Sequence, residues 1–176
     1  NPVARWFGLM FDSMIGSDFE KGLDNLKIVS EIIVQEKRPI VEIRNMPAVK
    51  IVSIREEIKW EEIEMKMAYM YGELLKFIEK ENLLMADVPF SIYHKIDNGM
   101  IDLEAAIPVE KLPEETSGII QAREIKAGKY VHADHFGPYD QLEKTHSFIQ
   151  KWMHQHELFV NGSPIEKYYT DPQNEP

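Results

Sequence analysis

The chain lacks cysteine, and basic residues are in the minority. Its 176 residues include no cysteine, and 30 acidic side chains against 20 basic ones give a formal net charge of −10. The first absence excludes disulfides, thiolate metal sites and a cysteine nucleophile. The second argues against direct nucleic-acid binding, because negative charge repels a phosphate backbone and no segment carries a lysine and arginine stripe.

Long apolar runs are absent as well. No stretch approaches the roughly 20 apolar residues that a membrane-spanning helix needs, and the start of the chain lacks the charged-then-apolar order of a secretory signal. The chain is nevertheless 44% hydrophobic, which is enough to bury a domain core. These features predict an acidic, cytoplasmic domain without membrane contact. Because the sequence begins with asparagine, we expect it to be a piece of a longer chain.

The pattern of apolar and β-branched residues predicts alternating strands and helices. Pro47 lies inside the first strand run and predicts a bulge or an edge there. Asn98-Gly99 lies between two apolar runs and predicts a tight hairpin, because both turn positions must accept φ > 0. The expected elements are a helix over 18–34, a strand region over 41–54, a helix over 60–80, strands over 89–96 and 100–109, a strand region over 118–136, a helix near 140–157 and a strand over 164–169.

The two halves of this pattern align without a gap. A shift of 75 positions places Pro89 on Pro164 and Tyr93 on Tyr168, which indicates a duplicated unit. We therefore expect an α+β fold in which two β-α-β-β units form one antiparallel sheet with two helices on one face. The second unit lacks its last strand, and the junction of the halves is the natural place for a ligand groove.

The last predicted strand holds the densest group of reactive side chains. Glu166 and Tyr168 point to the same side of this strand, and Ser91 and Tyr93 occupy the matching positions in the first half. A carboxylate flanked by tyrosines suits a flat organic cation, because the ligand charge compensates burial and each ring face adds roughly 0.5–2 kcal/mol of cation–π attraction. In the plainer interpretation Glu166 lies on a solvated strand and pairs with Lys167 or a cross-strand lysine.

Neither a metal site, nor a cofactor, nor a serine triad is expected. His132 and Asp134 can share one strand face, but two ligands fall short of the three protein ligands of a zinc site. Ser53, Ser91 and Ser163 lie outside any Gly-x-Ser-x-Gly motif, so the sequence does not predict a nucleophilic serine.

Several short motifs occur in a fixed order along residues 40–172. They are Asn98-Gly99-Met100, Ala106-Ile107-Pro108-Val109, Gly128-Lys129-Tyr130, Gly137-Pro138-Tyr139, Trp152, Pro164-x-Glu166-x-Tyr168 and Asp171-Pro172. In this order they resemble the gyrase-inhibitor-like family, which includes the effector-binding domains of multidrug-responsive bacterial transcription activators. The resemblance implies a duplicated fold with a small-molecule groove, and it implies that Glu166 is the acidic residue at the base of that groove.

We expect a non-catalytic domain that binds a small, flat, cationic or amphipathic organic molecule, for effector sensing or sequestration in a drug or toxin response. Glu166 would supply the charge, and the aromatic surface would come from Tyr93, Tyr139, Trp152 and Tyr168. Some relatives implied by the resemblance are hydrolases of cyclopropane-bearing toxins, and Glu166 and Tyr168 are the candidates for that alternative. A further alternative is a protein-binding module that inhibits a partner.

Residues 1–35 are expected to form a helical extension, and residues 36–176 the domain itself. The segment Gly16-Ser17-Asp18-Phe19-Glu20-Lys21-Gly22-Leu23 is similar to the closing helix of a polyketide-cyclase-like (START-like) domain. This similarity implies an upstream cyclase-like domain; the alternatives are a helix that packs on the domain and a homodimer partner. No segment supplies the helix-turn-helix of the related transcription activators, so we expect no direct DNA contact from this chain.

Overall fold

The structure is a computed structural model that describes residues 39–136 and 141–169. The chain divides into two compact units, residues 1–40 and 41–176. The helix expected over 18–34, the turn at Gly137-Pro138-Tyr139 and the motif Asp171-Pro172 lie outside the described residues. Neither of the described helices is both long and apolar enough to cross a membrane.

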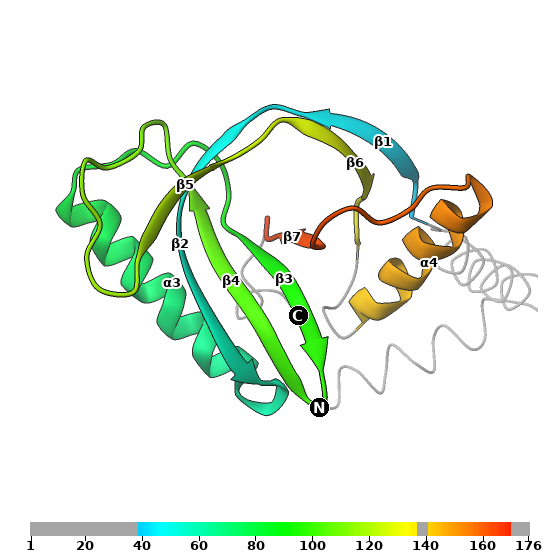
Figure 1. Cartoon of the computed structure of the whole chain (residues 1–176), viewed down its shortest axis with the longest axis horizontal. Coiled ribbons are helices and arrows are strands. Elements are labelled where there is room, and N and C mark those ends of the chain that lie inside the picture. The colour runs from blue at the N-terminus through cyan, green and yellow to red at the C-terminus, as the bar shows by residue number, and fades with distance from the viewer. Residues whose placement is uncertain (1–38, 137–140, 170–176) are drawn as a thin grey trace, which may run out of the picture. The chain divides into compact units, whose positions relative to one another are not determined.

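The described part of the second unit is an α+β domain (Figure 1), as expected. Its strands and helices follow the order that the hydrophobic pattern predicts, although the strand regions expected over 41–54 and 118–136 each divide in two. The elements are β1 (Val41–Met46), β2 (Val49–Lys59), the 3-10 turn η1 (Trp60–Glu62), α3 (Ile63–Lys80), β3 (Phe90–Asp97), β4 (Met100–Pro108), β5 (Gln121–Ile125), β6 (Gly128–Ala133), α4 (Leu142–Gln155) and β7 (Ile165–Lys167).

All strand pairs between these elements are antiparallel, but they form two sheets instead of the single sheet expected. One sheet has the order β5-β2-β4-β3-β7, and the other contains β1 and β6. The same register runs through both, because Met46 faces Gly128 and Val49 faces Ile125. The two sheets are therefore parts of one ribbon, interrupted where Pro47 cannot donate a ladder hydrogen bond. Figure 1 shows β1 and β6 arching away from the five-stranded sheet.

Helix α3 packs on one face of the five-stranded sheet, over β2 and β4 (Figure 1). Its apolar residues recur at helical spacing and meet every second residue of β4, so both periodicities converge on one core. The main residues of this core are Met70, Leu74, Phe77, Ile78, Ile101, Leu103, Ala105 and Ile107. A smaller apolar cluster covers the opposite face of the same sheet and contains Ile51, Phe90, Ile92 and Ala106.

The hairpin between β3 and β4 confirms the turn predicted from the sequence. Asn98 has φ 49° and Gly99 has φ 77°, and Asp97 pairs with Met100 on either side of them. Two consecutive residues with positive φ give the twist that a two-residue hairpin requires. This turn fixes the register of β3, the strand that carries the first half of the site.

The two halves of the domain meet where β3 pairs with β7. The N–H of Tyr93 donates to the carbonyl of Pro164 at 3.0 Å, and the N–H of Tyr168 donates to the carbonyl of Pro89 at 3.1 Å. The 75-residue shift converts one of these hydrogen bonds into the other. The β3–β7 ladder therefore lies on a pseudo-two-fold axis, and the duplication predicted from the sequence is confirmed.

Candidate ligand-binding site

Glu166 lies on this axis, and both of its carboxylate oxygens have partners. It faces Ser91 across the ladder, and its side chain is 16% exposed. Oε1 lies 2.6 Å from Nε2 of His146. Oε2 accepts hydrogen bonds from the hydroxyls of Tyr93 at 2.8 Å and Tyr168 at 3.1 Å. The interpretation of Glu166 as a residue of a solvated strand was therefore wrong, and Lys167 pairs with Asp87 instead.

Tyr93 and Tyr168 reach the carboxylate because strand alternation places them on its face of the sheet. Each lies two residues along the chain from a member of the Ser91–Glu166 pair. Their hydroxyl oxygens are 3.4 Å apart, so the two equivalent tyrosines meet above the pair. The sequence predicted this grouping of Tyr93, Glu166 and Tyr168, and the structure brings the three together.

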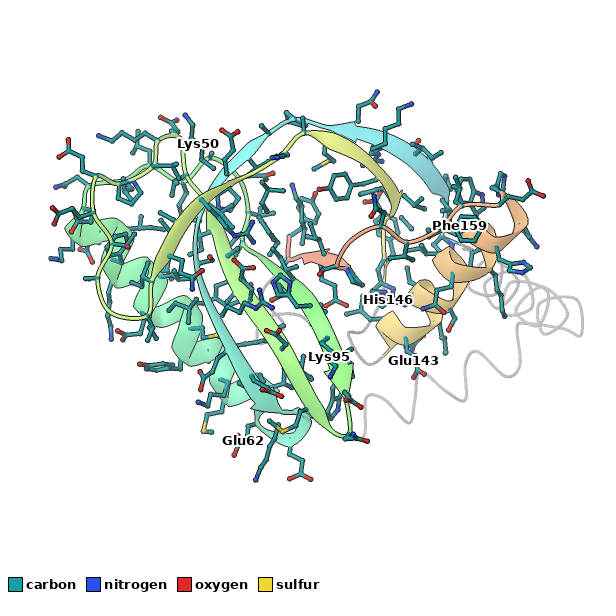
Figure 2. The ribbon with its side chains drawn as sticks, in the orientation of Figure 1. Lys50, Glu62, Lys95, Glu143, His146 and Phe159 are labelled. Atoms are coloured by element: carbon teal, nitrogen blue, oxygen red, sulfur yellow. The ribbon has the colours of Figure 1, made fainter. Side chains whose placement is uncertain are left out.

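His146 was missed by the sequence interpretation. It lies on α4 (Figures 1 and 2), and its Nε2 contacts Glu166 on β7. The 75-residue shift that relates the two halves places Tyr71 on His146. Tyr71 makes the equivalent contact in the first half, with its hydroxyl 3.0 Å from Oγ of Ser91. Once Tyr71 and Ser91 are known to be in contact, the repeat therefore predicts the contact between His146 and Glu166.

Charge in this site is concentrated in one of the two halves. Burial alone would raise the pKa of Glu166, but the hydrogen bonds from His146 and Tyr93 outweigh it and hold the pKa below its ordinary value. The hydrogen bond to Glu166 raises the pKa of His146 despite burial. Burial raises the pKa of Tyr93 and of Tyr168, so both hydroxyls stay protonated and donate. The site therefore combines a carboxylate, an imidazolium and neutral hydroxyls.

The structure does not bring the other two predicted aromatic residues to the carboxylate. Trp152 stacks on His156 with ring centroids 3.9 Å apart and planes inclined by 23°. It follows His146 by six residues on α4, which is about 240° around the helix axis, so it points away from the side that contacts Glu166. Tyr139 lies outside the described residues. A ligand contact by either residue stays a prediction.

His132 and Asp134 lie close to each other, and the positively charged side chain of Arg44 lies next to both. His132 Nε2 is 3.4 Å from Oδ1 of Asp134, and the guanidinium of Arg44 lies 3.2 Å from the same nitrogen. Over residues 39–136 and 141–169, no group of three or more histidine, aspartate or glutamate side chains is arranged to hold a metal ion. Arg44 supplies the positive charge at this position of the β1–β6 ladder.

Comparison with protein families agrees with this fold. The family described as the GyrI-like small molecule binding domain matches residues 40–176. The chain therefore belongs to the GyrI-like family, which confirms the resemblance noted in the sequence. The description of this family names small-molecule binding as its function. A search of curated proteins gives no match to the chain.

Two similar solved structures both contain a protein named EcmrR. The cryo-EM structure of the EcmrR–DNA complex in EcmrR-RPo is 19% identical with a TM-score of 0.69, and the match covers 99% of this chain and 66% of that one. The chain thus spans about 66% of the length of that protein. The crystal structure of the EcmrR C-terminal domain is 21% identical with a TM-score of 0.62, and the match covers 78% of this chain and 88% of that one. At these identities the similarity concerns the fold.

Proposed function

We propose that the domain binds a small cationic or amphipathic aromatic molecule at Glu166, for effector sensing or sequestration in a drug or toxin response. The observation that carries this proposal is a carboxylate that is 16% exposed and that its neighbours keep ionised. A charge held in a largely desolvated place attracts a counter-ion more strongly than one in water. The rings of Tyr93 and Tyr168 lie beside it and offer the surface that a flat ligand needs.

The counter-ion already present is His146, and a cationic ligand must compete with it. The carboxylate and the imidazolium together carry no net charge, so the site attracts a cation fully only when His146 is neutral. The side chain of His146 is 37% exposed, and solvent can therefore take up its proton. Cation binding on this basis replaces one bound proton, and the affinity depends on pH.

The comparisons support a role within a larger regulator. The first similar structure is a complex of EcmrR with DNA, whereas the second is the C-terminal domain of EcmrR. The net charge of −10 on this chain supports our proposal that the domain does not itself contact DNA. In that case ligand binding would act through a separate DNA-binding segment, or would only sequester the ligand.

The substitution Glu166→Gln tests the proposal because it removes the charge and keeps the shape. We expect a cationic xanthene dye to bind at least several-fold more weakly in a fluorescence anisotropy titration, while circular dichroism shows a folded protein. Glu114→Gln, at an exposed loop position, is the matched control and should bind the dye as the wild type does. Equal dye affinity in all three proteins would remove Glu166 from the ligand site.

A hydrolase is the second candidate, and the arrangement of proton donors and acceptors around Glu166 favours it. Glu166, His146, Tyr93 and Tyr168 are joined by hydrogen bonds of 2.6–3.1 Å, which is a suitable range for proton transfer. Glu166 would take a proton from water as the water oxygen bonds to a strained cyclopropane carbon and the ring C–C bond breaks. Tyr168 would donate its proton to the carbanion and regain a proton from Glu166 through the hydrogen bond that joins them. Turnover that Tyr168→Phe abolishes without loss of binding would establish this activity.

A further inference from the structure

A second polar cluster lies on the opposite face of the five-stranded sheet from Glu166. Its centre is Glu104 on β4, next to Leu103, which points into the α3 core. The side chain of Glu104 is 2% exposed. Its Oε2 lies 2.7 Å from Nε2 of His94 and 2.7 Å from Nη2 of Arg123. The Glu166 site uses none of these groups.

Strand alternation places His94 beside this cluster, because His94 follows Ile92 by two residues and Ile92 faces Glu104 in the ladder. The register between β3 and β4 shifts between Tyr93 and Lys95, so His94 lies at a β-bulge. Bulges are frequent beside active sites. The second ring nitrogen of His94, Nδ1, lies 3.2 Å from Oγ of Ser163, just before β7. Hydroxyl, imidazole and carboxylate therefore form one continuous hydrogen-bonded chain.

The ionisation state of Glu104 decides which atoms of these hydrogen bonds carry the protons. Burial would raise the pKa of Glu104, but the hydrogen bond from Arg123 helps to hold the pKa below its ordinary value. An ionised carboxylate only accepts hydrogen bonds, so Nε2 of His94 carries the proton that joins them. In a neutral imidazole Nδ1 is then unprotonated, and its lone pair faces the hydroxyl of Ser163. This is the state in which a histidine can act as a base toward serine.

We propose that Ser163, His94 and Glu104 form a nucleophilic triad for the hydrolysis of small carboxylic esters. Nucleophile, base and orienting acid stand in the order that such catalysis requires, with the two ring nitrogens exchanged relative to the serine proteases. Ser163 and His94 are the catalytic residues. Glu104 is a positioning residue that acts through His94, and Arg123 keeps it ionised.

The reaction balances with water as the only co-reactant. Oγ of Ser163 bonds to the ester carbonyl carbon while its proton passes to Nδ1 of His94. The C–O bond to the alcohol then breaks, and the alcohol leaves with that proton. Water next attacks the acyl-serine, His94 again carries the proton, and the acid is released as Ser163 is restored. Ser163 is half-buried, and the neighbouring Gly162 is exposed.

The sequence interpretation did not predict this triad, since Ser163 lies in Gly-Ser-Pro and not in a nucleophile elbow. Ser163 and His94 are 69 residues apart in the sequence, and His94 and Glu104 are 10 residues apart. They meet through the pairing of β3 with β4 and of β3 with β7. The register of these strand pairs does not follow from residue spacing.

Phosphonylation of the full chain by an alkyl fluorophosphonate tests the triad. The serine oxygen attacks phosphorus, fluoride leaves, and intact mass spectrometry should show one adduct that peptide mapping places on Ser163. Ser163→Ala should give no adduct, and His94→Gln should slow labelling at least tenfold. Ser117→Ala, at an exposed loop serine, is the matched control and should label at the wild-type rate.

Glu104→Gln separates positioning from mere structural support. Without the carboxylate, the imidazolium that forms as His94 takes the serine proton loses its anionic neighbour, so labelling should slow by at least about tenfold, and Glu104→Asp, which keeps the negative charge, should restore part of the rate. A wild-type labelling rate in Glu104→Gln would contradict the role of Glu104. Labelling of Ser163→Ala at the wild-type rate, or an adduct on a different residue, would overturn the triad. Dye binding at Glu166 is measured separately, so either proposal can fail alone.

Discussion

Ser91 and Glu166 face each other across the β3–β7 ladder and occupy the same position of the repeated unit. Their partners are also equivalent, because Tyr71 contacts Ser91 as His146 contacts Glu166. One half thus carries a neutral hydroxyl pair where the other carries an ion pair. The two halves therefore share one backbone arrangement but differ in charge at this position.

The affinity for a cationic dye should rise with pH. The pKa of His146 is raised above 6.5 by Glu166, so below that raised pKa the imidazolium occupies the carboxylate and competes with the dye. Above it the imidazole is neutral, and Glu166 presents an uncompensated charge. If one proton leaves per dye bound, the affinity changes by at most about tenfold per pH unit. Anisotropy titrations across this range measure the slope.

His146→Gln is the variant that tests this explanation. It should flatten the pH dependence between weakly acidic and weakly alkaline solution and leave dye binding in place. His154→Gln, on the same helix α4 and exposed, should keep the wild-type slope. An unchanged slope in His146→Gln would assign the pH dependence to a different group.

The ion pair of His146 and Glu166 should also stabilise the fold within a defined pH window. The folded-state pKa of His146 is raised above 6.5, so its contribution is complete below 6.5 and is lost as pH rises through the raised value. The folded-state pKa of Glu166 is lowered below 4.5, so its contribution is complete above 4.5 and is lost as pH falls through the lowered value. Both contributions are present together between these limits.

Urea denaturation of wild type and His146→Gln measures this effect. The difference in the free energy of unfolding should be larger at about pH 5.5 than at about pH 8.5. Other ionisable groups contribute equally to the free energy of unfolding of both proteins, so their contributions cancel in this difference. A difference that is equal at the two pH values would show that the pair does not contribute to stability.

Much of the fold could be predicted because its signals are local or repeated. The apolar spacing of α3, the Asn98-Gly99 turn and the 75-residue shift all lie in the sequence itself. Strand alternation likewise placed Glu166 and Tyr168 on one face. His146 could not be placed in this way, because its contact depends on the rotation of α4 relative to β7. The division into two sheets depends on the bend at Pro47. A proline in a strand predicts a break in the ladder, but it does not predict that the strand continues in a different sheet.

Gly99 should be sensitive to substitution for a reason that lies in the backbone. Its φ is 77°, and a Cβ there would meet no atom within 4 Å, so Gly99→Ala adds strain without a clash. We expect a loss of about 1–2 kcal/mol in the free energy of unfolding. Gly72 in α3 is the matched control, because it also has open space but a helical backbone. Gly72→Ala should gain about 0.5–1 kcal/mol, and thermal unfolding of both variants separates the two effects.

The charge asymmetry can be tested by copying the ion pair into the first half. Ser91→Glu alone places a second carboxylate opposite Glu166, and like charges in a partly buried site oppose each other. The protein should therefore lose stability near neutral pH and recover part of it in acid, where one carboxylate is protonated. Adding Tyr71→His supplies the equivalent of His146, since Tyr71 already lies against position 91.

The double variant should thus be more stable than the sum of its single substitutions indicates. A double-mutant cycle on the free energy of unfolding, at about pH 6, should give a favourable coupling of about 0.5–3 kcal/mol. Tyr69→His with Ser91→Glu is the matched control, because Tyr69 is an exposed residue of the same helix. Coupling of equal size in both cycles would mean that the new histidine acts through general charge and not through the contact that the repeat provides.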